Sequence, residues 1–537
     1  MSHSLYGKLY RRFGKMEPEI SAQSAKRLEA GKPTASTAAV SAGCQARLKN
    51  TRVAIVGGGF AGVMAAWCLG HQEREMEVVL FEAGDDVGGR VRSDEKLAKG
   101  RITEFGAELV GVKHTTWLSL ARELGIGMMV RTGEDHYAVL GLEMKHRIDG
   151  KDIGGKEGEA VAEKMEEIFK EFGKDAKLIK DAAAPFNQPE LQKFDQMSVA
   201  DKLEQLRPKL KIDKLTLREM EVFLGNDLVT PLAKINYLAL LCLVKAGQFG
   251  DDKEDPDLLG FWRHNETFRC TDGNQSLVRR MVAKLADPKE KFKFTLALKT
   301  PVLEIKIDPA NLRPVTLKWK PSDAAAKLNP NVGFDYVILA VPPSVWGGIT
   351  ITPQHPKDVL EPIQMGPAVK YFSGLKDRFW IRENAAPSGI SSDIGMIWEG
   401  TDNQTQVGDQ EIVLSHFAGG FAKSGRVLTE PDFQREIKKF YPGYEKSNSG
   451  RKTRLVNWAE TEEFIKTGYS CPRPGHIFQT APSLQKPFNG GRLFLAGEHT
   501  ETDFFGFMEG ALRSGCRAAK GVIAKVCPGD SAGFPNS

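Results

Sequence analysis

The sequence predicts an α/β protein whose parallel sheet is assembled from separate parts of the chain. Residues 52–56 form a continuous apolar strand, a helix of small residues follows over 61–69, and a second apolar strand spans 77–81. Similar buried strands return at 336–341 and 493–496. These observations predict a Rossmann-type domain built from discontinuous segments, with a mixed-sheet substrate domain and a helical insert between them.

Length and composition fit a globular protein of several parts. The chain has 537 residues, of which 41% are hydrophobic and 27% are charged, which excludes wholesale disorder. The longest nearly pure apolar run, 237–244, is much shorter than the roughly 20 residues that a membrane-spanning helix needs. We therefore expect no membrane span.

Positive charge is concentrated at the N-terminus. Nine Lys and Arg residues face three Glu residues in 1–50, and the rest of the chain is nearly neutral. The basic residues are not interleaved with aromatic ones, so this segment is interpreted as a solvated basic extension and no nucleic-acid function is predicted.

The cysteines carry no pattern. The seven are scattered, odd in number and never spaced as CxxC, so neither a disulfide framework nor a metal site is expected. A reducing, cytoplasmic setting fits this usage best.

The order of patterns divides the chain after the basic extension. In the predicted helical insert, Val161, Met165 and Phe172 share one helix face, and the segments 198–201 and 216–219 have the spacing of capping boxes that begin helices. We predict a nucleotide-binding domain from 51–111, 261–345 and 461–525, a substrate domain from the helical insert 112–260 and from 346–460, and a C-terminal tail at 526–537.

A glycine-rich turn joins the first strand to its helix. Gly57, Gly59 and Gly62 form GxGxxG around Phe60 and Ala61, where missing side chains let backbone amides approach a pyrophosphate. Glu82 ends the second strand, twenty residues beyond Gly62, and is placed to accept ribose hydroxyls. Ala83 follows it, and Gly89 and Arg90 supply a second glycine pair and a cation for the same pyrophosphate. A dinucleotide site is predicted.

At this point the sequence strongly resembles the flavin-containing amine oxidase family, over nearly all of 51–525. The shared motifs are GGGFAG at 57–62, GGRV at 88–91, EFGAELVG at 104–111, LAVPP at 339–343, and AGEH at 496–499 with GFMEGA at 506–511. The resemblance implies FAD at the junction of two domains. It places Val302 by the adenine, Gly497 and Glu498 near the ribityl and phosphate chain, and the Met508 amide near the flavin pyrimidine. Taken alone, Val302 is also an ordinary strand residue and Glu498 a loop or helix-cap acid.

Lys370 matches the family's lysine that holds a water beside flavin N5, where a cation could assist oxygen reduction. Taken alone, a lysine among apolar neighbours is usually a surface residue that extends its amine to water.

The substrate end departs from the relatives. Gly468 and Phe507 stand where many monoamine oxidases have two caging tyrosines, and Leu109 stands where L-amino-acid oxidases have an arginine. Glu108 could attract a substrate ammonium or be an exposed rim carboxylate. Trp398 ends a segment that resembles the amino-acid oxidase pocket, and Trp458 fits a wall segment.

The remaining family positions concern the arginine that binds a substrate carboxylate and the linkage to the cofactor. Arg378, Arg473 or another arginine could take the place of that missing arginine. Thr467 aligns with the cysteine of covalent flavoproteins and Cys471 lies four residues later, so FAD is expected without a covalent bond. His499 is expected to be structural.

The preferred function is an amine oxidase that transfers a hydride to flavin N5, releases an imine that water hydrolyses, and reduces O2 to H2O2. An L-amino-acid oxidase is the first alternative, a flavin-dependent desaturase the second, and a flavoprotein binding scaffold the third. The expected partners are molecular oxygen and a small amine or amino acid as substrate. If the protein forms an oligomer, a homodimer is the expected one.

Overall fold

The computed structural model describes most of the chain. The described residues are 42–70, 76–248, 261, 264–289, 292–326, 328–329, 331–404, 410–419 and 428–528. Most of the predicted basic extension and of the predicted tail lie outside them.

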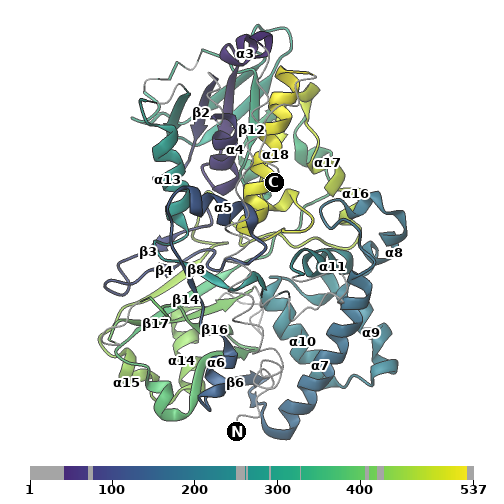
Figure 1. Cartoon of the computed structure of the whole chain (residues 1–537), viewed down its shortest axis with the longest axis vertical. Helices are drawn as coiled ribbons and strands as arrows, with labels where there is room; N and C mark the ends of the chain where they lie inside the picture. The colour runs from purple at the N-terminus through teal and green to yellow at the C-terminus, as the bar shows by residue number, and fades with distance from the viewer. Residues whose placement is uncertain are drawn as a thin grey trace.

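A five-stranded parallel sheet forms the upper half of the molecule (Figure 1). Its order is β19-β12-β1-β2-β9, so strands from both ends of the chain lie side by side. The strands are β1 (Arg52–Val56), β2 (Glu77–Phe81), β9 (Lys293–Ala297), β12 (Tyr336–Leu339) and β19 (Leu493–Leu495). The predicted Rossmann-type domain from discontinuous segments is confirmed, because continuous apolar runs are what a sheet buried on both faces requires.

Helices pack against one face of the five-stranded sheet and against one another. α4 (Phe60–Gly70) packs along α18 (Met508–Val526), and a Cβ on Gly515 would overlap the carbonyl oxygen of Ala61. Beside them lie α5 (Thr115–Glu123) and α13 (Gln275–Leu285), while α17 (Ala481–Leu484) follows α16 (His476–Gln479), which lies next to the helices of the other half. On the other face of the sheet, a second apolar core includes residues of the three-stranded sheet of β10 (Val302–Ile307), β11 (Val315–Trp319) and β13 (Thr350–Thr352).

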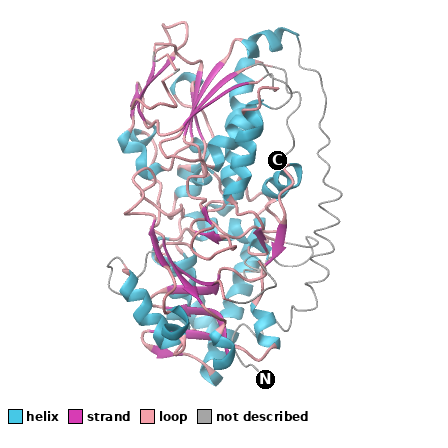
Figure 2. Ribbon diagram, turned by 90° about the vertical axis from the view of Figure 1, so that its left-hand side faces the viewer, coloured by secondary structure: helices cyan, strands magenta, loops and turns pink. Residues whose placement is uncertain are grey.

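A seven-stranded mixed sheet forms the lower half, and Figure 2 shows the strands of the two halves as separate groups. Its order is β18-β14-β17-β16-β15-β6-β7. The strands are β6 (Glu143–Ile148), β7 (Lys151–Asp152), β14 (Val369–Leu375), β15 (Ala385–Ser391), β16 (Gly395–Glu399), β17 (Ile412–Ala418) and β18 (Thr453–Asn457), with α14 (Glu430–Phe440) and α15 (Tyr444–Asn448) against them. The predicted helical insert also contributes strands to this sheet, because β6 and β7 lie within 112–260 and β6 pairs in parallel with β15.

Most of the described part of the insert is helical. After α5, its α-helices are α6 (Glu134–Val139), α7 (Gly155–Ala176), α8 (Gln192–Asp195), α9 (Val199–Leu210), α10 (Lys214–Asp227) and α11 (Tyr237–Ala246). The Ser198 capping box is present, whereas Thr216 lies inside α10, whose N-cap is Asp213. Asp213 accepts a hydrogen bond from the Thr216 amide, so the helix begins earlier than the 216–219 pattern predicts.

The two ends of the described chain are joined. α3 (Ala42–Lys49) lies against α18, Cys44 forms a disulfide with Cys527 across a Cα–Cα distance of 5.4 Å, and Arg47 Nε donates to Val526 O at 2.8 Å. The expectation that no cysteines pair is wrong for these two, and their pairing gives no support to a reducing setting. Among the described helices, none has the length and apolar character needed to cross a bilayer.

Candidate active site

A cavity of about 1000 Å³ runs from the glycine-rich turn of the five-stranded sheet to the mixed sheet. Every site residue predicted from sequence lines it except Gly62. Both domains contribute walls, which places the cavity where the resemblance expects the flavin.

Glycines shape the dinucleotide end. Gly57 has a φ of +107°, and a Cβ on Gly62 would overlap the carbonyl oxygen of Gly57. Gly59 forms a bridge with Gly88, and nothing lies within 4 Å of a Cβ placed on it. Gly62 therefore shapes the turn without facing the cavity, while Gly59 leaves open space into which a pyrophosphate fits.

Glu82 ties two turns together. Its Oε2 accepts from Gly58 N and its Oε1 from Gly84 N, both at 2.6 Å. Burial raises the pKa of Glu82, and backbone hydrogen bonds offset part of that rise. The carboxylate lines the cavity beside Ala83, where the ribose of a dinucleotide is expected.

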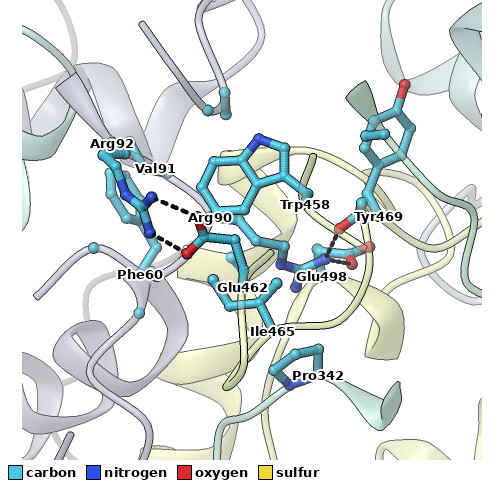
Figure 3. A pocket seen from close by; sticks show the side chains of 18 of the residues that line it. Phe60, Arg90, Val91, Arg92, Pro342, Trp458, Glu462, Ile465, Tyr469 and Glu498 are labelled. Carbon is cyan, nitrogen blue, oxygen red and sulfur yellow. Dashed lines mark hydrogen bonds and ion pairs between the residues drawn. The ribbon is translucent and has the colours of Figure 1, made fainter. Parts of the chain in front are cut away.

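Arg90 and Glu498 form an ion pair in the cavity wall (Figure 3). Arg90 Nη1 donates to Glu498 Oε1 at 2.6 Å and to Gly468 O at 2.9 Å. Glu498 also accepts from Ser470 Oγ at 2.5 Å and from Gly506 N at 2.6 Å. Burial would raise the pKa of Glu498, but Arg90 and the hydrogen bonds outweigh burial and hold this pKa below its usual value. An ionised carboxylate thus anchors three segments of the wall.

A second ion pair lies close by in Figure 3. Arg92 and Glu462 form two hydrogen bonds of 2.9 and 2.7 Å, and the guanidinium lies 4.9 Å from the Trp458 ring centre. Trp458 Nε1 donates to Phe105 O at 3.0 Å, so the indole is fixed in the cavity wall.

His499 takes no part in the cavity lining. Burial lowers its pKa to about 3, and its ring nitrogens have no hydrogen-bond partner among the described residues. The ring packs at 5.7 Å from Trp346, which agrees with a structural role for a neutral imidazole.

Lys370 projects from β14 and is 5% exposed, so the surface alternative is wrong. Its Nζ donates to Glu104 O at 2.8 Å, to Gly106 O at 3.0 Å and to Glu108 Oε2 at 2.9 Å. The residue lines the cavity, so a buried lysine lies in its wall.

Glu108 is 8% exposed, so the exposed-rim alternative is also wrong. Its Oε1 accepts from Trp398 Nε1 at 2.8 Å and lies 3.0 Å from Arg269 Nη2. Burial would raise the pKa of Glu108, but Lys370 and Arg269 outweigh burial and lower it. Both oxygens are engaged by protein groups, which leaves this carboxylate poorly placed to bind a substrate ammonium.

Glu104→Gln should gain stability relative to the wild type as pH rises. Burial raises the pKa of Glu104 to about 7, against hydrogen bonds from Asn274 N and Ser93 Oγ. The folded wild type therefore keeps a proton on Glu104 that the unfolded chain releases near pH 4.5. The stabilisation that comes from this proton is complete below pH 4.5 and is lost as pH rises through 7. Since glutamine mimics the protonated acid, the difference should reach at most about 3 kcal/mol.

Urea unfolding of both proteins at about pH 5 and about pH 8 measures this change. An equal stability difference at the two pH values would contradict the assignment of Glu104.

The two cage positions differ in what they allow. A Cβ on Gly468 would lie 2.6 Å from Ala368 Cβ and 2.8 Å from Gly366 O, so no side chain fits there without movement. Phe507 packs edge-on to His114 at 5.4 Å and to Phe261 at 6.0 Å, and it lines the cavity. A single phenylalanine remains where the family's cage has two tyrosines.

The expected replacement arginines lie elsewhere. Arg378 pairs with Glu399 and Arg473 with Glu361, and neither lines the cavity, whereas Leu109 does. Sequence reasoning missed Arg131, which follows β5 (Met128–Val130) and lines the cavity. No local sequence pattern marks Arg131. Its position depends on the pairing of β5 with β8 (Phe268–Cys270), a strand that lies far along the chain.

The cysteines lie away from this cavity. Thr467 Oγ1 donates to Gly366 O, and Cys471 is fully buried outside the lining residues. A thiol is therefore not offered to the cofactor at the family's linking position, in agreement with FAD held non-covalently.

Comparisons with known proteins agree with this geometry. The family model described as flavin containing amine oxidoreductase matches residues 60–523. The chain is 23% identical to a flavin-containing amine oxidase of Oncorhynchus mykiss, covering 88% of this chain and 86% of that protein. It is 24% identical to a probable flavin-containing monoamine oxidase A of Dictyostelium discoideum, covering 88% and 98%.

Two solved structures share the fold. Putrescine oxidase bound to putrescine has a TM-score of 0.68 at 20% identity, over 88% of this chain and 99% of that one. Cyclohexylamine oxidase from Brevibacterium oxydans IH-35A has a TM-score of 0.68 at 19% identity, over 89% and 99%.

Proposed function

The chain belongs to the flavin-containing amine oxidoreductase family, and from that premise we propose that it oxidises an amine to an imine. When bound, FAD would supply the redox chemistry: a hydride would move from the carbon beside nitrogen to N5, and O2 would be reduced to H2O2. The imine is hydrolysed by water.

We propose that the chain holds FAD along the whole cavity. Gly57, Gly59, Phe60, Ala61 and the N-terminus of α4 would face the pyrophosphate, with Glu82 on the ribose. The remaining contacts would come from Ala83, Gly89, Arg90, Val302, Gly497, Glu498 and the amide of Met508. The open space at Gly59 and the buried carboxylate of Glu82 support this assignment.

The observation that carries the amine assignment is the wall around Lys370. Leu109, Trp398 and Phe507 line it, and the Glu108 charge is already paired with Lys370 and Arg269. Such a wall desolvates a bound amine, which lowers the pKa of the amine itself and favours the neutral form that can donate a hydride. The chain then needs no strong base. Its role is to bind and orient the amine and to exclude water from it.

One observation favours an L-amino-acid oxidase instead. Arg131 lines the same cavity, and its side chain is 14% exposed. Its Nε donates to Glu266 O at 3.0 Å, and Nη2 lies 3.9 Å from Glu266 Oε2. A guanidinium held in this way could accept a substrate carboxylate from a position other than that of Leu109.

Anaerobic mixing with amines and with L-amino acids should bleach the flavin band for amines. Bleaching by amino acids alone would replace the amine assignment, and Arg131→Met should then weaken amino-acid binding while Arg473→Met, at an ion pair outside the cavity, should not. A yellow protein bleached by neither class would favour the desaturase or scaffold alternative.

A further inference from the structure

We infer that Glu108 is a positioning residue that fixes the Lys370 ammonium in the cavity wall and balances its charge. The inference deepens the proposed function, since Lys370 matters to catalysis only if a flavin lies beside it. The geometry that carries it is a continuous chain of buried charged groups, Lys370–Glu108–Arg269–Asp402.

The ammonium is held by a tripod. An ammonium has three N–H donors, and the carbonyls of Glu104 and Gly106 and the carboxylate of Glu108 provide three acceptors at 2.8, 3.0 and 2.9 Å. Two of the acceptors belong to the backbone, so Glu108 is the ionised member of the tripod. It sets both the position of Nζ and the local charge.

Glu108 is itself held in place. Trp398 Nε1 and Arg269 Nη2 approach its Oε1 at 2.8 and 3.0 Å, leaving Oε2 for the lysine. Arg269 also pairs with Asp402, whose Oδ2 accepts from Thr132 N at 2.6 Å. The charge order is therefore positive, negative, positive, negative from the cavity wall inward.

All four side chains are at least nine-tenths buried, with exposed fractions of 6, 7, 4 and 6% from Lys370 to Asp402. A buried charge without a partner is costly, whereas alternating charges offset each other. Removing the Glu108 charge leaves two buried cations against one carboxylate in this chain, and removing the Lys370 charge leaves the opposite excess.

The chain also modifies what the family resemblance implies for Lys370. All three ammonium donors have protein acceptors, so a water that binds the lysine must replace one of them. Glu108 is the one side-chain acceptor of the three, so it is the acceptor that a side-chain rotation could exchange for a water.

The first test is a double-mutant cycle in the cofactor-free protein, from Glu108→Gln, Lys370→Met and both together. Lys370→Met should lower the unfolding midpoint in the wild type but leave it unchanged or raise it in the Glu108→Gln background, because there the lysine is a buried cation without its carboxylate. Asp503→Asn provides the control, since Asp503 is a buried carboxylate that pairs with Arg513, outside this chain of charges. Its effect should add to that of Lys370→Met. Additive behaviour of Glu108→Gln with Lys370→Met would overturn the inference.

The second test measures charge directly, as the midpoint potential of the flavin in the reconstituted protein. Reduced flavin gains negative charge, so Glu108→Gln should shift the potential positive and Lys370→Met should shift it negative, with the double variant near the wild type. Glu108→Asp keeps the charge and should leave the potential nearly unchanged. If Glu108→Gln does not fold, a negative shift in Lys370→Met without a shift in Glu108→Asp supports the inference, and shifts of the same sign overturn it.

The two tests separate the inference from the proposed function. The unfolding cycle requires no cofactor, so it can succeed in a protein that binds no FAD. Conversely, amines could reduce the flavin while the effects of Glu108→Gln and Lys370→Met on unfolding are additive. That result would retain the proposed function and exclude the role inferred for Glu108.

Discussion

Gly62→Ala is expected to abolish flavin binding and to lower the stability of the cofactor-free protein by about 3 kcal/mol. The added methyl, in the first turn of α4, would overlap the carbonyl oxygen of Gly57, which belongs to the backbone that joins β1 to this helix. Since the backbone cannot move aside as a flexible side chain can, the turn must change shape. Flavin absorbance after reconstitution and urea unfolding measure the two effects.

Gly59→Ala is the matched comparison within the same motif. Nothing lies within 4 Å of a Cβ at Gly59, so the cofactor-free protein should keep its stability. Gly59 lines the cavity, however, and the methyl would face the expected pyrophosphate, so FAD binding should weaken. Equal losses of stability in the two variants would show that the glycines act only through chain flexibility.

Lys370→Met should slow reoxidation of the reduced enzyme by O2 about 10²-fold, a typical effect of removing one preorganised charge from a site. Reduction by substrate should change much less, because a neutral amine donates its hydride without a cation beside it. Stopped-flow measurement of each half-reaction separates the two rates.

Lys376→Met is the control, because Lys376 follows the same strand and is exposed. It should leave both rates unchanged. A Lys370→Met variant in which both half-reactions slow equally would contradict the role proposed for this lysine.

The dinucleotide half of the fold could be predicted from sequence because its signals are local. β1 and β2 are short apolar runs that begin and end at the predicted residues, and the glycine motif at 57–62 runs from the end of β1 into the first turn of α4, as the motif requires. Burial on both faces of a parallel sheet produces such runs whatever the rest of the chain does.

Other features depend on contacts between distant residues, and these contacts have no local signal. Glu108 and Lys370 are 262 positions apart, and Cys44 and Cys527 are 483 apart. The motif at 104–111 predicts that Glu108 lies near the flavin, but only the packing of β14 against that loop shows that its charge is paired. The pairing of β6 with β15 is likewise a property of the assembled sheet.

The strand order of the parallel sheet has a consequence for biosynthesis. β1 is flanked by β2 and by β12, and β19, which precedes Glu498, closes the far edge. While the ribosome is still translating the middle of the chain, the glycine-rich turn exists without the wall that Glu498 and Met508 complete. Cofactor loading should therefore follow release of the nearly finished polypeptide, and a truncated chain that ends before β19 should not retain flavin.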